Sequence, residues 1–353
     1  MKGEESRSLY RKYRPQTFAE VRGQEQVVEV LSAALSQGVT THAYLFTGSR
    51  GTGKTSVARI FARELGCEPE DLYEIDGASN RGIDEIRALK ESVQTRPFRG
   101  AVKVYVIDEV HMLTKDAFNA LLKTLEEPPE FVTFILATTE VHKIPETILS
   151  RCQVFTFKKP NEHILREALL DVAKKEKIKL ADDAATLLAF LAGGSFRDAY
   201  VTLEQIIHAT GARENREIKA SDVEKILGVP QRALVREVVR ATVEGDTEKG
   251  ITALISADDK NIDMKLFTKL IIKTLRNAFI LRYAPTTKTR LTNELGEDEI
   301  AFLNELNAHQ NANAIPQILR TFLDAYDAVR NSYIESLPLT LALAKLSENK
   351  KGE

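Results

Sequence analysis

The stretch GSRGTGKT at 48–55 constrains the fold more than any other part of the sequence. It fits the pattern G-x-x-x-x-G-K-[ST], follows the apolar run AYLFTG and opens the helical pattern KTSVARIFAREL. The glycines allow backbone N–H groups to turn toward phosphates, and the N-terminus of the helix adds the positive end of its dipole. This context predicts a phosphate-binding loop between a strand and a helix. The alternative is a glycine-rich turn without a ligand.

The loop gives its side chains expected roles in binding a nucleotide. We expect Lys54 to reach the β- and γ-phosphates and the Thr55 hydroxyl to bind Mg²⁺. The predicted nucleotide-binding residues of this stretch are Gly48, Ser49, Arg50, Gly51, Thr52, Gly53, Lys54, Thr55 and Ser56.

An acidic pair follows the apolar run VYVIDE at 104–109. Asp108, at the end of the predicted strand, would complete the Mg²⁺ site. Glu109 is placed to polarise a water that attacks the γ-phosphate. The alternative is a solvated acidic strand end. One strand candidate lies between the loop and Asp108, and that order, together with Glu109, favours hydrolysis by water over transfer to a small substrate.

Three further polar residues are candidates for sensing the γ-phosphate. Thr138 and Thr139 end the apolar run 131–139, which we expect beside the strand of the phosphate loop. The preference of threonine for strands is an alternative reason for their presence. Arg197 begins a helical pattern in a later segment, where an arginine reports bound nucleotide by domain closure. An ordinary surface arginine is the alternative.

The arrangement of apolar runs predicts an α/β domain followed by helices. Residues 1–160 alternate short strand-like runs with helix-length segments, which is typical of a parallel five-stranded sheet. From Asn161 the strands stop, and we expect a small helical domain over 161–228, an all-helical domain over 229–345 and a disordered tail over 346–353. The strand candidates are 43–48, 72–76, 102–108, 131–139 and 152–157.

Composition narrows the classes of partner and compartment. The net charge of the 353-residue chain is −2, so a nucleic acid would have to meet a local basic patch. No apolar run approaches the ~20 residues of a membrane span, and the charged N-terminus is unlike a secretory signal. The two cysteines, Cys67 and Cys152, exclude a disulfide framework and fit a reducing cytoplasm.

Five stretches together closely resemble the gamma/tau subunits of bacterial DNA polymerase III, which are clamp-loader ATPases of the AAA+ class. The resemblance covers about residues 8–228 at the level of motifs, and the helical remainder matches in length and character. The stretches are YRPQTFAEVRGQE (13–25), HAYLFTGSRGTGKTS (42–56), VYVIDEVHMLTKDAFNALLKTLEEPP (104–129), LATTEVHKIPETILSRC (136–152) and GGSFRDA (193–199).

The resemblance implies an ATP hydrolase with a P-loop AAA+ domain, a helical lid and a helical collar over 229–345. It implies a five-subunit ring that uses ATP and Mg²⁺ to place a sliding clamp on primed DNA. The implied partners are delta- and delta-prime-type subunits, further copies of the chain, the clamp and DNA, with no membrane. Thr139 would be the first sensor and Arg197 the second, and the segment around Arg11, Pro15 and Val21 would wrap the adenine.

The resemblance also separates the two reactive residues of LSRC at 149–152. The arginine of this motif in the family reaches the ATP site of the neighbouring subunit, so Arg151 is expected to act in trans. A guanidinium there neutralises charge in the transition state. Cys152 lacks nucleophile or metal-ligand company and is expected to be an apolar core thiol.

Two helices are implied to line the DNA channel of the ring. Arg81 precedes one and Lys123 lies on the other, over 115–127, and we expect both to contact phosphates without reading sequence. Solvated helix faces are the alternative.

The sequence departs from the family in two places. Most members carry a four-cysteine zinc module before the second strand, but LGCEPEDLYEID at 65–76 holds only Cys67, so we predict no zinc. The long extension of tau forms is absent, which makes the chain gamma-like in length; a truncated chain is the alternative.

Three rival functions remain open at this point. A P-loop kinase is disfavoured by Glu109 and by the absence of an evident substrate lid. A branch-migration helicase or replication initiator often adds a winged-helix domain, and the last segment lacks the strand pair that such a domain needs. A clamp-loader subunit without nucleotide is disfavoured by the intact loop and acidic pair.

Overall fold

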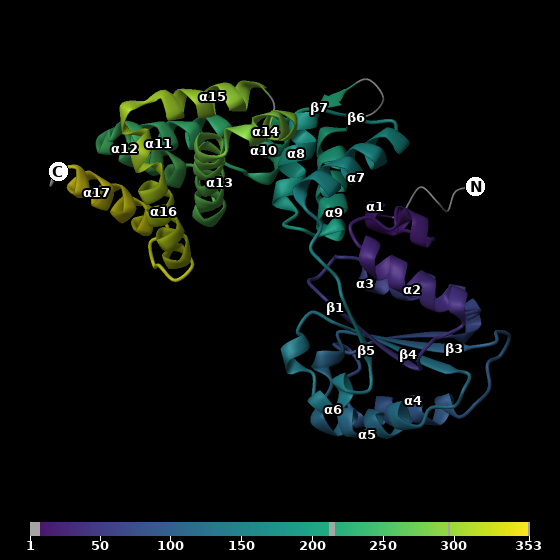
Figure 1. The fold of residues 1–353 in the computed structure, drawn as a ribbon. Helices are drawn as coiled ribbons and strands as arrows, with labels where there is room; N and C mark the ends of the chain where they lie inside the picture. The colour runs from purple at the N-terminus through teal and green to yellow at the C-terminus, as the bar shows by residue number, and fades with distance from the viewer. Residues whose placement is uncertain (1–7, 212–215, 296, 352–353) are drawn as a thin grey trace. The chain divides into compact units, whose positions relative to one another are not determined.

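The computed structural model describes residues 8–211, 216–295 and 297–351 (Figure 1). The chain divides into two compact units. The first contains residues 1–172 and 189–204, and the second contains 173–188 and 205–353. Within the described residues no helix is long and apolar enough to cross a membrane.

The first unit is built on a five-stranded parallel sheet with the order β2-β3-β4-β1-β5. All five strand candidates are confirmed to within two residues at each end, and β4 pairs with β1 as expected. The strands are β1 (Ala43–Thr47), β2 (Leu72–Asp76), β3 (Lys103–Asp108), β4 (Val132–Thr138) and β5 (Gln153–Thr156).

Helices cover both faces of this sheet, which explains why its central strands are apolar without alternation. Tyr44 and Phe46 pack under α2 and α3, whereas Ala43 and Leu45 pack under α4, α5 and α6 (Figure 1). Because all five strands are parallel, their C-terminal ends lie at one edge of the sheet. The site residues lie at this edge. The covering helices are α2 (Glu25–Gln37), α3 (Lys54–Glu64), α4 (Ile83–Val93), α5 (Lys115–Glu126) and α6 (Glu146–Leu149).

Short helical turns connect these elements, and three longer helices follow the sheet. The helices α7, α8 and α9 each contribute residues to both units, so the predicted lid segment 161–228 is shared between them. The elements are α1 (Leu9–Lys12), η1 (Phe18–Glu20), η2 (Pro69–Asp71), η3 (Val110–Met112), η4 (Val141–Lys143), α7 (Glu162–Lys175), α8 (Asp182–Leu191) and α9 (Phe196–Thr210).

The second unit is mostly helical, with one continuous apolar core between residues 234 and 343. Its longest helix, α13, coincides with the apolar pattern at 264–283. The helices are α10 (Ala220–Leu227), α11 (Arg232–Glu244), α12 (Thr247–Asp259), α13 (Met264–Tyr283), η5 (Pro285–Thr287), α14 (Lys288–Leu295), α15 (Glu297–Ala308), η6 (Gln310–Ala314), α16 (Ile315–Val329) and α17 (Leu337–Lys351).

Two expectations for this region are corrected. Strands do not stop at Asn161, because β6 (Lys179–Leu180) pairs in parallel with β7 (Glu217–Ile218); two-residue strands are too short to leave an alternating pattern. The expected disordered tail is helical through Lys351, because α17 is anchored by the buried Leu339 and Leu343 and by Leu346 against the core. Residues 352–353 lie outside the described residues.

Candidate nucleotide-binding and hydrolysis site

The predicted phosphate loop lies between β1 and α3, as the sequence indicates. Gly48, Gly51 and Gly53 all have positive φ, at 146°, 74° and 103°, and Gly53 precedes the first residue of α3. A Cβ on Gly48 would lie 2.5 Å from the Phe157 carbonyl oxygen, so the loop could not pass β5 with any other residue there. The Thr52 hydroxyl is buried and donates to the Ser49 carbonyl over 2.9 Å.

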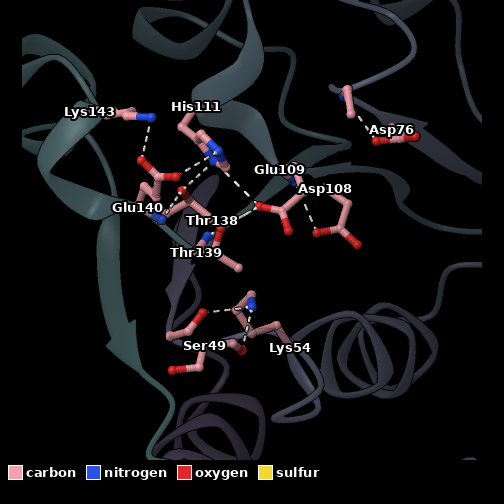
Figure 2. Close-up of polar contacts among 12 residues, drawn as sticks. Ser49, Lys54, Asp76, Asp108, Glu109, His111, Thr138, Thr139, Glu140 and Lys143 are labelled. Carbon is pink, nitrogen blue, oxygen red and sulfur yellow. Dashed lines mark hydrogen bonds and ion pairs between the residues drawn. The ribbon is translucent and has the colours of Figure 1, made fainter. Parts of the chain in front are cut away.

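Lys54 is folded into this loop. Its side chain is buried, and Nζ donates to the carbonyl oxygens of Gly48 and Ser49 over 2.8 and 3.0 Å (Figure 2). Burial lowers the pKa of Lys54, and the nearby Glu109 and Asp108 carboxylates oppose that shift. The ammonium is therefore held where phosphates would replace the two carbonyl groups as its partners.

The predicted ligands of Mg²⁺ are brought together. The Thr55 hydroxyl donates to Asp108 Oδ2 over 2.8 Å, joining the start of α3 to the end of β3 across 53 residues of sequence. A hydroxyl and a carboxylate are hard oxygen ligands of the kind that Mg²⁺ binds beside nucleotide phosphates. This pair thus fits a magnesium ion.

Glu109 follows Asp108 in a left-handed backbone conformation, with φ of 48°. Such a conformation costs about 1–3 kcal/mol for a residue other than glycine and persists where surrounding contacts impose it. Here Glu109 Oε2 accepts from the Thr139 hydroxyl over 2.9 Å and from the Thr139 N–H over 3.3 Å (Figure 2). The predicted water-activating carboxylate and first sensor are therefore in direct contact.

The two threonines at the end of β4 have different surroundings. Thr138 is fully buried, and its hydroxyl oxygen accepts the N–H of Glu140 and lies 3.0 Å from Nδ1 of His111. Only Thr139 has its hydroxyl on Glu109. Of the two candidates, Thr139 is the one in contact with the predicted water-activating carboxylate.

Arg197 lies in the first turn of α9, within the same compact unit as the phosphate loop rather than in a separate domain. The preceding residues contact the loop: the Phe196 N–H donates to the Gly51 carbonyl over 3.0 Å, and a Cβ on Gly51 would lie 2.0 Å from Ser195 Oγ. The Arg197 guanidinium lies over the Tyr10 ring, 5.0 Å from its centroid. Arg197 therefore lies beside α1 and directly follows Phe196, whose N–H contacts the loop.

One residue of the expected adenine segment, Arg11, contacts the same tyrosine as Arg197. Arg11 Nε donates to the Tyr10 hydroxyl over 2.9 Å, and the same hydrogen bond is the main cause of a lowered pKa of Tyr10. Val21 packs against the core beneath α3, and Pro15 is half-buried. The structure therefore places Arg11 close to the ring that Arg197 contacts.

Arg151 has no contact with the chain's own phosphate loop among the interactions of the described residues. Its guanidinium donates to Glu126 Oε1 over 2.6 Å and to the Thr147 carbonyl over 2.7 Å. The side chain keeps 34% of its surface exposed. These contacts leave it at the surface between α5 and α6.

The two predicted DNA contacts are both exposed. Arg81 precedes α4 and donates from Nε to the Ala78 carbonyl, and its own carbonyl accepts the N–H of Thr114 just before α5. Lys123 is exposed on α5. Helices α4 and α5 pack against each other.

Both cysteines are shielded thiols. Burial raises the pKa of Cys67 and of Cys152 to about 11, so neither is a thiolate at neutral pH. Cys152 lies just before β5 and packs partly against the core; it does not begin a buried strand, because β5 is an edge strand with one buried residue. Among the described residues no group of three or more His, Cys, Asp and Glu side chains is arranged to hold a metal ion.

Several residues that shape the site were not predicted. Gln24 is buried, and its side chain donates to the carbonyl groups of Thr52 and Lys158 and accepts the N–H of Lys158. Ser195, Tyr10 and His111 make the contacts described above. Tyr10 and Gln24 stand within or beside the YRPQTFAEVRGQE region, and His111 follows Glu109 by two residues. Proximity to the motifs was the only signal in the sequence.

Comparison with known proteins places this geometry in a family. The model of the DNA polymerase III delta subunit matches residues 23–82 and 70–161, and that of domain III of subunits gamma and tau matches 218–351. The Holliday junction branch migration motor RuvB of Thermotoga maritima has a TM-score of 0.52 at 23% identity, covering 66% of this chain and 80% of its own. At that identity the likeness shows the shared P-loop fold alone.

Curated relatives match over most of the chain. The gamma/tau subunit of Mycoplasma genitalium is 37% identical over 85% of this chain and 52% of its own length. Tau of Escherichia coli is 39% identical over 87% and 49%, so the chain spans about half the length of these relatives. The gamma subunit of Buchnera aphidicola is 33% identical over 88% of this chain and 90% of its own. The chain therefore belongs to the gamma/tau family of DNA polymerase III subunits.

Proposed function

We propose that this chain is an ATPase subunit of a clamp loader, which binds and hydrolyses ATP with Mg²⁺ to place a sliding clamp on primed DNA. The observation that carries the proposal is the pairing of Thr55 with Asp108 beside the pairing of Glu109 with Thr139. One pair supplies the ligands of a metal, and the other supplies a carboxylate that is tied to a sensor.

Each residue of the site has a separate role in the proposed hydrolysis. Lys54 exchanges its two loop carbonyl partners for phosphate oxygens, and the N–H groups of the loop and the start of α3 bind the phosphates. Thr55 and Asp108 would hold Mg²⁺, which would supply positive charge beside the phosphates. Glu109 orients the attacking water and takes its proton, and Thr139 holds that carboxylate in place.

Arg151 and Arg197 link hydrolysis to assembly. The surface position of Arg151 supports a role in the ATP site of a neighbouring subunit, where its guanidinium would neutralise the transition state. Arg197, whose guanidinium lies over the Tyr10 ring, would contact the γ-phosphate and report ATP. Arg11, Pro15 and Val21 would line the adenine side.

Family membership and the helical second unit support a proposal about partners. We infer a ring of copies of this chain with delta- and delta-prime-type subunits, held together by the helical collar at 229–345 and working in the cytoplasm on the clamp and primed DNA. The lid at 161–228 would close over ATP. The exposure of Arg81, just before α4, and of Lys123, on α5, supports a DNA-facing surface on this part of the chain.

The direct test reconstitutes the ring with candidate partner subunits and measures ATP hydrolysis with the clamp, primed DNA, both or neither. We expect the highest rate with both, and clamp retained on circular primed DNA in an ATP-dependent way. The matched Glu109→Gln variant should bind ATP and the clamp but not turn over. A rate that responds to neither clamp nor DNA would exclude clamp loading. Consumption of ATP only in the presence of a small phosphate acceptor would favour a kinase.

A further inference from the structure

A buried histidine lies beside the proposed water-activating carboxylate. His111, in η3, has a side chain that is only 6% exposed, and its ring stands between two carboxylates (Figure 2). Nδ1 lies 3.4 Å from Glu109 Oε2 and 3.0 Å from the Thr138 hydroxyl. Nε2 lies 3.9 Å from Glu140 Oε1.

The chemistry of these neighbours fixes what the ring offers to Glu109. An ionised carboxylate only accepts hydrogen bonds, so Nδ1 attracts Glu109 when it carries a hydrogen. Glu109 Oε2 also accepts from both donors of Thr139. With a hydrogen on Nδ1, this oxygen is therefore approached by a donor from the η3 side as well as from the end of β4, which leaves the second oxygen for a water.

A charged pair lies on the far side of the ring. Glu140, which directly precedes η4, faces Nε2 of His111 with one oxygen and Lys143 Nζ with the other, the latter at 2.5 Å. The Lys143 hydrogen bond is the main cause of a lowered pKa of Glu140, so this carboxylate is ionised at neutral pH. Glu140 also donates its N–H to the Thr138 hydroxyl oxygen. The Nε2 edge of the ring therefore faces an ionised carboxylate that is paired with Lys143.

We propose that His111 is a positioning residue that holds the Glu109 carboxylate in the orientation needed to activate water, through the Nδ1 edge of its ring. The inference rests on the proposed ATPase function. Because Glu109 stands in a left-handed backbone conformation, its side chain depends on such contacts for its direction. Among the interactions of the described residues, His111 contacts neither Thr55 nor Asp108, so we infer that it acts on the rate through Glu109.

Two isosteric variants separate the ring nitrogens. His111→Asn keeps a donor at the position of Nδ1, His111→Gln keeps one at the position of Nε2, and His111→Phe keeps neither. The readouts are kcat for ATP hydrolysis by the chain in its ring and the Kd for ATP in the presence of EDTA and of Mg²⁺. We expect His111→Asn to stay close to the wild-type kcat and His111→Gln and His111→Phe to lose ~10–100-fold, with an unchanged Kd.

His142 is the matched control. Its imidazole also faces Glu140, at 3.7 Å, but is 74% exposed and has no contact with Glu109 among the described interactions. His142→Phe should leave kcat unchanged. In a Glu109→Gln background, His111→Phe should cost nothing further, because the group that it positions is gone.

Three results would overturn the proposal: a His111→Asn variant as slow as His111→Phe, a His111→Phe variant as fast as the wild type, or equal losses of kcat and ATP binding in all three variants. If His111→Phe fails to fold, the Asn and Gln pair still decides. A wild-type chain that neither binds nor hydrolyses ATP would overturn the proposed function and this inference together, whereas differences among the variants concern His111 alone.

Discussion

The Arg151 guanidinium is paired with the Glu126 carboxylate, 2.6 Å away, at the end of α5. Both side chains are partly exposed, at 34% and 47%, and an exposed pair of this kind stabilises by only about 1 kcal/mol or less. A phosphate from a neighbouring subunit can therefore replace Glu126 as the partner of Arg151 at little cost.

We predict that Arg151→Ala leaves ATP binding by the isolated chain unchanged and lowers hydrolysis by the assembled ring by ~10³-fold, the scale of arginine groups supplied in trans. Fluorescent-nucleotide titration and steady-state hydrolysis measure the two effects. Glu126→Gln is the matched control: it removes the competing carboxylate, so the ring should keep its rate. Equal loss in the isolated chain and in the ring would contradict a role in trans.

The Thr55 and Asp108 pair predicts a specific dependence on Mg²⁺. Thr55→Val removes the hydroxyl while keeping the shape of the side chain, so the Mg²⁺ concentration for half-maximal hydrolysis should rise by at least ~10-fold. Thr55→Ser keeps the hydroxyl and should behave like the wild type. Titration of Mg²⁺ at saturating ATP gives both values, and identical curves for the Val and Ser variants would remove Thr55 from the metal site.

The contact between Glu109 and Thr139 predicts separable effects on rate and binding. Glu109→Gln keeps an oxygen that can accept from Thr139, so the site stays assembled, but the base is lost and kcat should fall by ~10²–10⁴-fold. The Kd for ATP should not change. Single-turnover hydrolysis measures the loss, and a comparable loss in ATP affinity would mean that Glu109 binds nucleotide instead.

Asp71 predicts a pH dependence of stability in the segment without a zinc module. The side chain is buried, which raises its pKa, but the N–H groups of Gly100, Arg99 and Phe98 donate to the carboxylate and the net shift is downward. A lowered folded-state pKa means that stabilisation is complete above the unfolded value of about 3.9 and is lost as the pH falls through the folded value.

Asp71→Asn should therefore lower the free energy of unfolding by about 2 kcal/mol at pH 7, the scale of hydrogen bonds to a charged group. The difference from the wild type should shrink below about pH 4. Urea unfolding at several pH values measures it. A difference that stays constant to pH 3 would show that the charge of Asp71 is not what stabilises the loop.

The exposed Arg81, before α4, and Lys123, on α5, predict a change in the salt dependence of DNA binding. Changing Arg81 and Lys123 to Ala removes two phosphate contacts, so the slope of log K against log salt should weaken by about 2. A variant with Arg96 and Arg99 changed to Ala removes as much charge from the exposed loop after α4 and should keep the slope. Equal slopes in the wild type and the Arg81 and Lys123 variant would leave both residues as solvated surface.

Much of the first unit was predictable because local patterns decide it. The five strand candidates were right to within two residues because their apolar runs are bounded by turn and helix signals. The phosphate loop was predictable because Gly48, Gly51 and Gly53 require conformations that other residues avoid. Asp108 and Thr139 followed from these, since parallel strands end at one edge.

The roles of the histidine and tyrosine in the site were not predictable from their own positions. The role of His111 depends on its contacts with Thr138 and Glu140, which are 27 and 29 residues away in sequence. The role of Tyr10 depends on its contact with Arg197, which lies in a helix that follows the sheet. Likewise, the division of labour between Thr138 and Thr139 depends on which hydroxyl the end of β4 turns toward Glu109.

The sequence by itself determined the class of this protein: a phosphate loop, an acidic pair at a strand end and helices beyond, all set by residues close together in the chain. The tertiary structure decided which side chains meet. It put Thr55 on Asp108, Thr139 and His111 around Glu109, and Arg151 on Glu126. Those contacts join segments that are distant in sequence, and only the packing of helices on both faces of the sheet fixes their distances.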